Sequence, residues 1–290
     1  MGYVPSILVT GANGQLGSEL KKLSSAYSQY TFTFLTRDEF PLNDTVRIKD
    51  YLKSNQFDFL INCAAYTAVD KAESEKELAW QINATAVGVL AAACRDNIIK
   101  FLHISTDYVF DGTAKEPYKV DDLTNPQTVY GASKLEGERL AMNENSDAII
   151  IRTSWVYSSY GNNFMKTMLR LFQEKEQISV VNDQIGSPTY AADLAEVIMK
   201  MISSGQWYEG IYHFSNEGVI SWFDFAGAIK NLSGSSCKIN PIPTSAYPTP
   251  AKRPAWSVLE KSKIQQHYGI QFRNWEESLR LCIEKIKKAQ

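Results

Sequence analysis

The sequence has little of what marks a nucleic-acid-binding or metal-binding protein. Its 30 lysines and arginines are balanced by 32 aspartates and glutamates, and the net charge of −2 gives no broad positive field for a phosphate backbone. Only 4 cysteines are present, and no two of them have the spacing of metal ligands. We therefore expect no nucleic-acid partner, no metal site made by cysteines, and the reduced thiols of a cytoplasmic protein.

Long apolar runs are also missing. No uninterrupted apolar stretch could span a bilayer, and only five residues precede the first apolar strand, so we expect no membrane segment and no secretory signal. No repeat of fixed period is visible, which excludes solenoid architectures. The 44% hydrophobic and 21% charged fractions are those of a globular chain, whose length suits one large domain with a smaller companion.

The first half of the chain alternates short β-branched runs with amphipathic segments, a pattern typical of parallel strands joined by crossover helices. The predicted strands lie near 6–10, 31–36, 58–62, 99–105, 148–153 and 178–182. The predicted helices lie near 15–25, 45–54, 75–95, 127–144 and 161–174. For the helix at 75–95, Ser74 and Glu77 have the spacing of a capping box.

The composition changes after about residue 183, where Gly, Pro and Ser separate shorter elements. We therefore predict an α/β fold, a Rossmann-type doubly wound parallel sheet with a small C-terminal substrate-binding lobe. The dinucleotide-binding domain is expected over 1–183, and the lobe mainly over 184–290, with room for some segments to return to the first domain.

A glycine loop follows the first predicted strand directly. Its residues are Gly11, Ala12, Asn13, Gly14, Gln15, Leu16 and Gly17, and helix formers come next. Gly11 permits the tight turn, Gly14 lets the backbone approach a pyrophosphate, and Gly17 allows the helix to pack on the strand. The spacing GxxGxxG departs from the GxGxxG fingerprint, and tight turns need glycine too. The position in the first βαβ unit favours a dinucleotide site.

The end of the second strand bears on the choice of cofactor. Where an NAD enzyme usually carries an acidic residue, this chain has Thr36 and Arg37. Because arginine favours a 2′-phosphate, we expect NADPH rather than NADH, with Arg37 as the contact. Asp38 is adjacent, so a strand end shifted by one residue would reverse the argument, and a solvated surface role for Arg37 is the alternative.

Tyr130 and Lys134 are four residues apart and therefore share one face of a helix that we expect to begin near 125–126. A nearby ammonium favours the phenolate form of a tyrosine, and Tyr130 could then give its proton to a carbonyl oxygen as hydride arrives at carbon. Lys134 would also hold the nicotinamide ribose. The strand at 101–105 ends beside Thr106, our candidate for polarising the carbonyl. A chance helix-surface pair is the alternative.

Six segments together carry a family resemblance: TGANGQLG, AAYTAVDKAE, STDYVFDG, YGASKLEGE, RTSWVY and GSPTYAADLA. As an ordered set they resemble the dTDP-4-dehydrorhamnose reductase family of the extended short-chain dehydrogenases/reductases. The resemblance implies a Rossmann fold, NADPH or NADH as reductant, and reduction of the 4-keto group of dTDP-4-dehydro-β-L-rhamnose to dTDP-L-rhamnose. The product would serve the synthesis of cell-surface polysaccharide.

The resemblance also assigns roles to single residues. The family's catalytic residues fall on Thr106, Tyr130 and Lys134, and its substrate side includes Asp107 and Trp155, for which core packing is the alternative. Its cofactor contacts fall on Asn13, Gly14, Gln15, Leu16, Asn43, Asp44, Ala64, Ala65 and Tyr66. Two positions depart from the family pattern, namely Asn43 in place of an aspartate and Trp256 in place of an asparagine. The three histidines, His103, His213 and His267, receive no role.

The expected partner is a dTDP-sugar, and the resemblance leaves open a homodimer and a Mg²⁺ ion at a subunit contact. Two other readings compete. The first is a nucleotide-sugar epimerase or dehydratase with bound NAD, against which Arg37 and the compact C-terminal part count. The second is a non-enzymatic dinucleotide-binding protein, like family relatives that are regulatory subunits of methionine adenosyltransferase; the intact Thr106, Tyr130 and Lys134 count against it.

Overall fold

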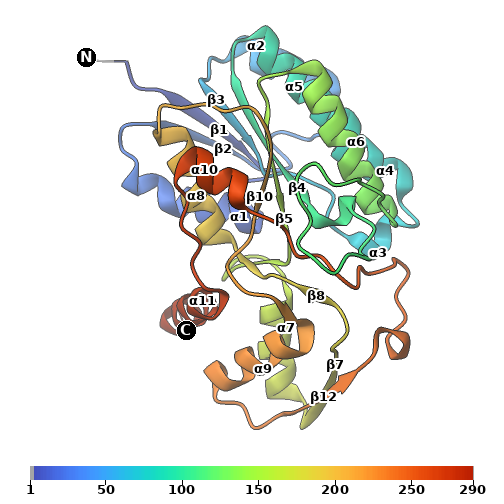
Figure 1. The fold of residues 1–290 in the computed structure, drawn as a ribbon. Coiled ribbons are helices and arrows are strands. Elements are labelled where there is room, and N and C mark those ends of the chain that lie inside the picture. The colour runs from blue at the N-terminus through green and yellow to red at the C-terminus, as the bar shows by residue number, and fades with distance from the viewer. Residues whose placement is uncertain (1–2, 290) are drawn as a thin grey trace.

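The computed structural model describes residues 3–289, and a six-stranded parallel sheet forms one half of the molecule (Figure 1). The strand order is β10-β5-β4-β3-β1-β2, and every neighbouring pair is parallel. The strands are β1 (Ser6–Thr10), β2 (Thr31–Leu35), β3 (Phe59–Asn62), β4 (Lys100–Thr106), β5 (Ile149–Thr153) and β10 (Gly210–Phe214). The predicted Rossmann-type fold class is confirmed.

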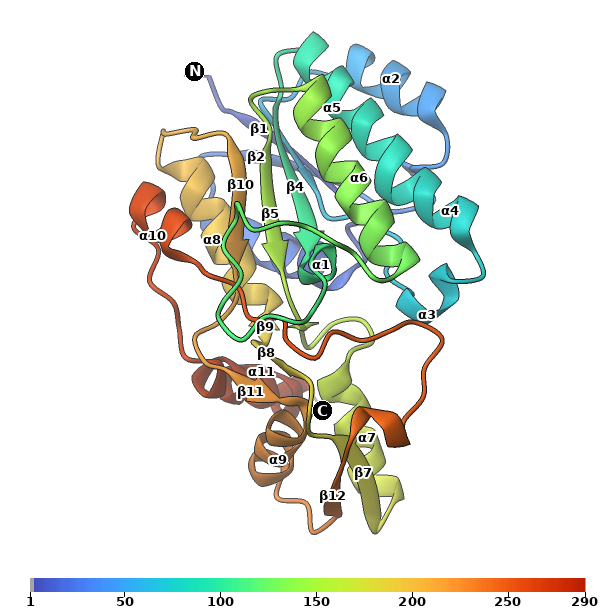
Figure 2. The same cartoon turned by 45° about the vertical axis from the view of Figure 1, so that its right-hand side comes forward.

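Helices cover both faces of this sheet (Figure 2). One face carries α1 (Gln15–Leu23), α8 (Ala191–Ser203) and α10 (Ser262–Tyr268), and the other carries α2 (Thr45–Ser54), α5 (Ala86–Asp96) and α6 (Val129–Glu144). The alternation within β1 shows why both faces are covered. Ile7 and Val9 pack towards α1 and α8, whereas Leu8 packs towards α2 and α5, and all three side chains are fully buried.

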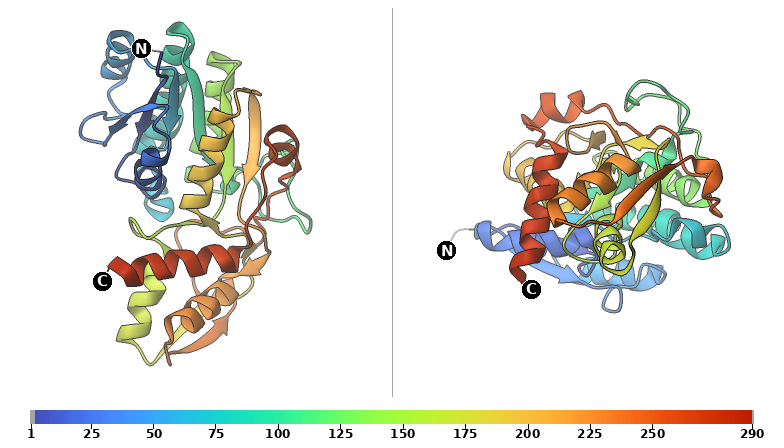
Figure 3. Two further views of the ribbon diagram at one scale, coloured as in Figure 1. Left: turned by 90° about the vertical axis from the view of Figure 1, so that its left-hand side faces the viewer. Right: turned by 90° about the horizontal axis from the view of Figure 1, so that it is seen from below.

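A smaller lobe lies below the carboxyl ends of the strands, and Figure 3 shows α11 crossing between the sheet half and the rest of the lobe. Its own hydrophobic core joins three helices and one strand pair. The helices are α7 (Phe164–Glu174), α9 (Trp222–Ser233) and α11 (Trp275–Ala289), and the parallel pair is β7 (Gln177–Val181) with β12 (Lys238–Ile242). Two short strand pairs lie nearby, β6 (Val156–Tyr157) with β9 (Thr189–Tyr190) and β8 (Ile185–Gly186) with β11 (Ile220–Ser221).

The chain passes between the two halves repeatedly. The strand predicted at 178–182 is present as β7, but it pairs with β12 in the lobe, and β10 takes the edge of the main sheet beside β5. The placement of that strand in the main sheet was therefore wrong. Both α7 and β7 precede residue 183 yet pack in the lobe, whereas α8, β10 and α10 follow it and pack on the sheet half.

The segment predicted as one helix over 75–95 is divided. It consists of α4 (Lys76–Trp80), a π-helical turn η2 (Gln81–Thr85) and α5, and a short helix α3 (Val69–Ala72) precedes it. The predicted capping box is wrong, because the Ser74 hydroxyl donates to the Lys71 carbonyl instead. The π turn places Asn83 where its side chain bonds both backbone polar groups of Tyr66. Such turns often mark functional sites.

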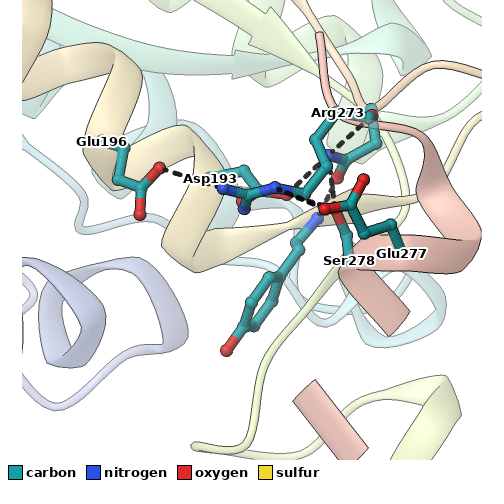
Figure 4. Close-up of polar contacts among 7 residues, drawn as sticks. Asp193, Glu196, Arg273, Glu277 and Ser278 are labelled. Atoms are coloured by element: carbon teal, nitrogen blue, oxygen red, sulfur yellow. Dashed lines mark hydrogen bonds and ion pairs between the residues drawn. The ribbon is translucent and has the colours of Figure 1, made fainter. Parts of the chain in front are cut away.

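A polar network ties α8 of the sheet half to α11 of the lobe (Figure 4). Arg273, just before α11, forms ion pairs with Asp193 and Glu196 of α8 and with Glu277 of α11. The Ser278 hydroxyl also donates to Asp193, whose side chain is only 6% exposed. The network holds the lobe against the sheet half. Among residues 3–289, none of the helices combines the length and apolarity needed to cross a membrane.

Candidate active site

A cleft of about 850 Å³ opens at the carboxyl ends of the strands, between the sheet half and the lobe. This is where open α/β sheets bind ligands, and the volume falls in the usual range of such sites. Most of the residues predicted for cofactor, substrate and catalysis line it: Gly11, Gly14, Gln15, Leu16, Arg37, Asn43, Ala64, Ala65, Tyr66, Thr106, Asp107, Tyr130, Lys134 and Trp155.

The glycine loop has the shape that a dinucleotide phosphate requires. Gly11 has a φ of +69°, and a Cβ built there would lie 2.8 Å from the Ala64 nitrogen. A Cβ at Gly17 would lie 2.4 Å from the Gly11 carbonyl oxygen, so α1 packs directly under the loop. Gly14 is the N-cap of α1 and supplies no side-chain cap, which leaves amides of the first turn free for an anion. The loop therefore fits a pyrophosphate.

The other residues predicted for the cofactor divide into two groups. Arg37 lies in the turn after β2, is exposed, and lines the cleft, whereas Asp38 does not line it. Asn13, Gly17 and Asp44 lie outside the lining. For Asp44 the reason is local, because its carboxylate caps α2 by accepting from a backbone N–H at 3.0 Å.

Helix α6 positions Tyr130 and Lys134 side by side on the cleft wall. It begins at Val129, later than predicted, because the Thr128 hydroxyl caps it by accepting from the Gly131 N–H at 3.0 Å. Gly131 lets the helix approach closely, since a Cβ there would lie 2.2 Å from the carbonyl oxygen of Tyr108. This close approach brings Tyr130 next to the end of β4, where Thr106 lies.

Thr106 and Asp107 form a short polar unit at the end of β4. The Thr106 hydroxyl donates to Asp107 Oδ1 at 2.9 Å and accepts from the Tyr108 N–H at 3.2 Å. Asp107 is 4% exposed, and its Oδ2 has no hydrogen-bond partner among residues 3–289. Burial raises the pKa of Asp107 to about 6. A carboxyl group with one unpaired oxygen in a cleft can bind a hydroxyl of a ligand.

The pKa values of Tyr130 and Lys134 correct one expectation. Burial raises the pKa of the Tyr130 phenol, and the nearby Thr106 hydroxyl opposes that shift only in part. Burial lowers the pKa of Lys134 to about 8 against the opposing charge of Glu138. The expected lowering of the tyrosine pKa by Lys134 is wrong here, because the lysine Nζ donates to the Ile104 carbonyl at 2.6 Å instead. The raised pKa favours the protonated phenol, the form that a general acid requires.

Trp222 is a site residue that sequence reasoning missed. Its ring stacks on that of Trp155, with centroids 3.6 Å apart and planes inclined by 10°, and both line the cleft. Trp155 has a φ of +49°, which is uncommon for a bulky residue and aims its ring at α9. No local pattern around Trp222 distinguishes it from a core aromatic, because its role depends on a neighbour far away in the chain.

Arg253, three residues before Trp256, is a second residue that sequence reasoning missed, although it does not itself line the cleft. Its guanidinium donates to the Tyr108 hydroxyl at 3.1 Å and pairs with Asp70 at 2.5 Å, which links the segment just before Trp256 to the cleft wall. Trp256, the departure in the same segment, donates to the Glu116 carbonyl at 2.9 Å and does not line the cleft. Its bulk therefore does not shape the cleft.

Neither His213 of β10 nor His267 of α10 lines the cleft, and His103 lies buried beneath it. The four cysteines are free thiols. Within residues 3–289, no group of three or more His, Cys, Asp or Glu side chains is arranged to hold a metal ion.

Comparison with known proteins places this geometry in a family. The family described as RmlD substrate binding domain matches residues 5–288. The dTDP-4-dehydrorhamnose reductase of Aggregatibacter actinomycetemcomitans is 43% identical over 284 residues, covering 94% of this chain and 97% of the relative. The spore coat polysaccharide biosynthesis protein SpsK of Bacillus subtilis is 42% identical, with 98% of each chain covered.

A solved structure agrees with these sequence matches. The dTDP-4-dehydrorhamnose reductase of Bacillus anthracis, crystallised in complex with NADP, superposes with a TM-score of 0.94 at 37% identity, covering 98% of this chain and 100% of that one. The match extends through the sheet half and the lobe alike. The chain therefore belongs to the dTDP-4-dehydrorhamnose reductase family of extended short-chain dehydrogenases/reductases.

Proposed function

We propose that this protein uses NADPH to reduce the 4-keto group of a dTDP-4-dehydro-6-deoxy sugar, converting dTDP-4-dehydro-β-L-rhamnose to dTDP-L-rhamnose for polysaccharide synthesis. The observation that carries the proposal is the meeting of Thr106, Tyr130 and Lys134 in one cleft above the glycine loop. Relatives that share more than 40% of their residues with this chain over nearly its full length bear the name of that reductase.

The roles of the residues follow from their chemistry. Bound reduced nicotinamide supplies the hydride that goes to the carbonyl carbon. The Thr106 hydroxyl, which donates to Asp107 Oδ1 in the structure, turns to donate a hydrogen bond to the carbonyl oxygen, and the Tyr130 phenol gives that oxygen its proton. The ketone thus gains one hydride and one proton and becomes an alcohol. Asp107 accepts from a hydroxyl of the sugar, and Lys134 holds the nicotinamide ribose.

The stacked pair of Trp155 and Trp222 forms the lobe side of the cleft. A flat aromatic surface packs well against the apolar face of a sugar ring, and the 6-deoxy methyl group of the proposed substrate enlarges that face. The two halves then have separate tasks, because the glycine loop binds the dinucleotide phosphates and the lobe covers the sugar.

Purified protein, incubated with NADPH and a small panel of 4-keto nucleotide sugars, provides the decisive test. Consumption of one NADPH for each dTDP-4-dehydro-6-deoxy sugar, followed by the loss of reduced-nicotinamide absorbance, is the expected result. Turnover of a nucleotide sugar without added reductant would favour an epimerase or a dehydratase. Dinucleotide binding without any turnover would favour the regulatory-subunit alternative.

The preference for NADPH gives a prediction for Arg37. Because Arg37 lines the cleft and Asp38 does not, Arg37→Ser should raise the KM for NADPH roughly tenfold while changing the KM for NADH little. Steady-state kinetics with both reductants measures the two constants. Arg139→Ser is the matched control, because Arg139 is an exposed arginine that pairs with Glu136 on α6. Equal changes in the two KM values would show that Arg37 does not contact the 2′-phosphate.

A further inference from the structure

A buried line of four polar side chains runs beneath the cleft. It begins with Thr10 at the end of β1, continues through Asn62 of β3 and His103 of β4, and ends at Lys134 of α6. The register of the sheet creates it, since Thr10 is paired with Asn62, and Asn62 with His103. No member of the line is more than 1% exposed. Buried polar groups at such depth are held by specific hydrogen bonds.

The direction of these hydrogen bonds can be worked out from the backbone. The Ala64 N–H, which can only donate, lies 3.2 Å from Asn62 Oδ1, and the Thr10 hydroxyl donates to the same oxygen at 2.7 Å. The amide group of Asn62 is therefore oriented with its NH₂ towards His103 Nδ1, 2.9 Å away. Nδ1 must accept this bond, so the neutral imidazole carries its proton on Nε2.

The Nε2–H of His103 points at Lys134, whose Nζ is 3.0 Å away. An ammonium group has three donors and no lone pair, so a bond donated by the Nε2–H requires the neutral amine of lysine as its acceptor. That amine accepts from His103, donates to the Ile104 carbonyl, and retains one further N–H. We propose that His103, fixed in its Nε2–H form by Asn62, is a positioning residue that stabilises the neutral amine of Lys134.

The charges around Lys134 agree with this assignment. Glu138, one turn along α6, is already matched by Arg152 of β5, which donates to both of its carboxylate oxygens. Tyr130 on α6 and Asp107 after β4 are titratable groups that line the same cleft as Lys134. Among residues 3–289 no carboxylate hydrogen-bonds to Lys134 Nζ. Burial lowers the pKa of Lys134 to about 8, which brings the amine within reach near neutral pH, and burial keeps the imidazole of His103 neutral.

The arrangement has a use that rests on the proposed function. Once Tyr130 has given its proton to the substrate oxygen, the phenolate must take up another one. The ammonium form of Lys134 can supply that proton and become the amine that His103 stabilises, and the amine regains a proton from water in the open cleft. By stabilising the amine, His103 lowers the pKa of Lys134. The ammonium form then gives up its proton more readily, which promotes reprotonation of Tyr130.

The first test reads the imidazole directly and needs no substrate. In the protein labelled with ¹⁵N-histidine, nitrogen chemical shifts should show His103 protonated on Nε2 alone from about pH 6 to about pH 9, because burial keeps the ring neutral. His103→Phe assigns the signal among the three histidines. In Asn62→Asp the carboxylate accepts from Nδ1, so the proton should move to Nδ1. An Nδ1–H form or a charged ring in the unsubstituted protein would overturn the proposal.

The second test reads Lys134 through the pH dependence of turnover. Its pKa of about 8 should appear as the alkaline limb of kcat. Loss of the donor in His103→Phe destabilises the amine, so the limb should move up by about one pH unit. Asn62→Asp turns Nε2 into an acceptor for the ammonium and should therefore also move the alkaline limb to higher pH. His103→Gln keeps a donor, so its alkaline limb should lie between those of His103→Phe and the unsubstituted protein.

His213→Phe is the matched control, because His213 is also a buried histidine of the sheet but contacts the Glu260 carbonyl and Arg152 rather than Lys134. Its alkaline limb should stay in place. An unmoved limb in folded His103→Phe and Asn62→Asp, checked by circular dichroism, refutes the proposal. If the proposed function is wrong and no turnover is found, the nitrogen chemical shifts of His103 still show whether its proton lies on Nε2.

Discussion

Replacing Tyr130 by phenylalanine should reduce kcat by about two orders of magnitude or more, the scale of a lost general acid. The change removes one oxygen atom and keeps the ring, whose edge-to-face contact with Tyr108 at 5.5 Å is preserved. Cofactor affinity should change little, because the glycine loop that receives the phosphates lies on another element. The expected loss is therefore in kcat and not in cofactor binding.

The measurement combines steady-state kinetics on the keto sugar with a titration of NADPH by fluorescence. Tyr51→Phe serves as the control, because Tyr51 packs against Phe40 and Phe57 around α2 and does not line the cleft. That variant should keep full activity. If Tyr130→Phe keeps it too, the phenol is not the proton donor and the mechanism proposed above is wrong.

Glu138→Ala should destabilise the fold by about 3–5 kcal/mol, the usual cost of leaving a buried charge without its partner. Glu138 and Arg152 are each 3% exposed in their side chains, and they form an ion pair at 2.7 Å that Ser105 supports with a hydrogen bond. Without the carboxylate, the guanidinium keeps the Val120 carbonyl, a long contact with His213 and the face of the Phe110 ring, none of which carries a negative charge. The loss of stability should affect global unfolding, because the pair joins α6 to β5.

Denaturant unfolding followed by circular dichroism gives the free energy of unfolding for comparison. The double variant Glu138→Leu with Arg152→Met removes both charges at similar volume, and it should recover much of the loss. Glu136→Ala, which breaks an exposed pair with Arg139 on the same helix, should have a small effect. A double variant as unstable as Glu138→Ala would show that packing, not the unpaired charge, causes the loss.

Local patterns in the sequence predicted much of this protein. The first five strands were placed within one residue of their bounds, because runs of β-branched residues between helices have few alternatives. The glycine loop and the pair of Tyr130 and Lys134 were found for a similar reason. Each depends on spacing within one turn or one helix, and so each can be recognised without knowledge of distant residues.

What sequence reasoning missed depends on contacts between distant segments. The edge position of β10 is decided by its pairing with β5, and Trp222 becomes a site residue only because Trp155 lies on it. The capping role assigned to Ser74 failed because a competing turn uses its hydroxyl. His103 was left without a role, since only the register of three strands reveals that its ring joins Asn62 to Lys134.

The repeated passage of the chain between its two halves limits how such an enzyme can be re-engineered. A cut after residue 183 would take β10 from the sheet edge and would separate α7 from α9, which share one core. The lobe therefore cannot be transplanted from a relative as one continuous segment. A chimera with altered sugar specificity must exchange its discontinuous segments together while keeping the crossings between them intact.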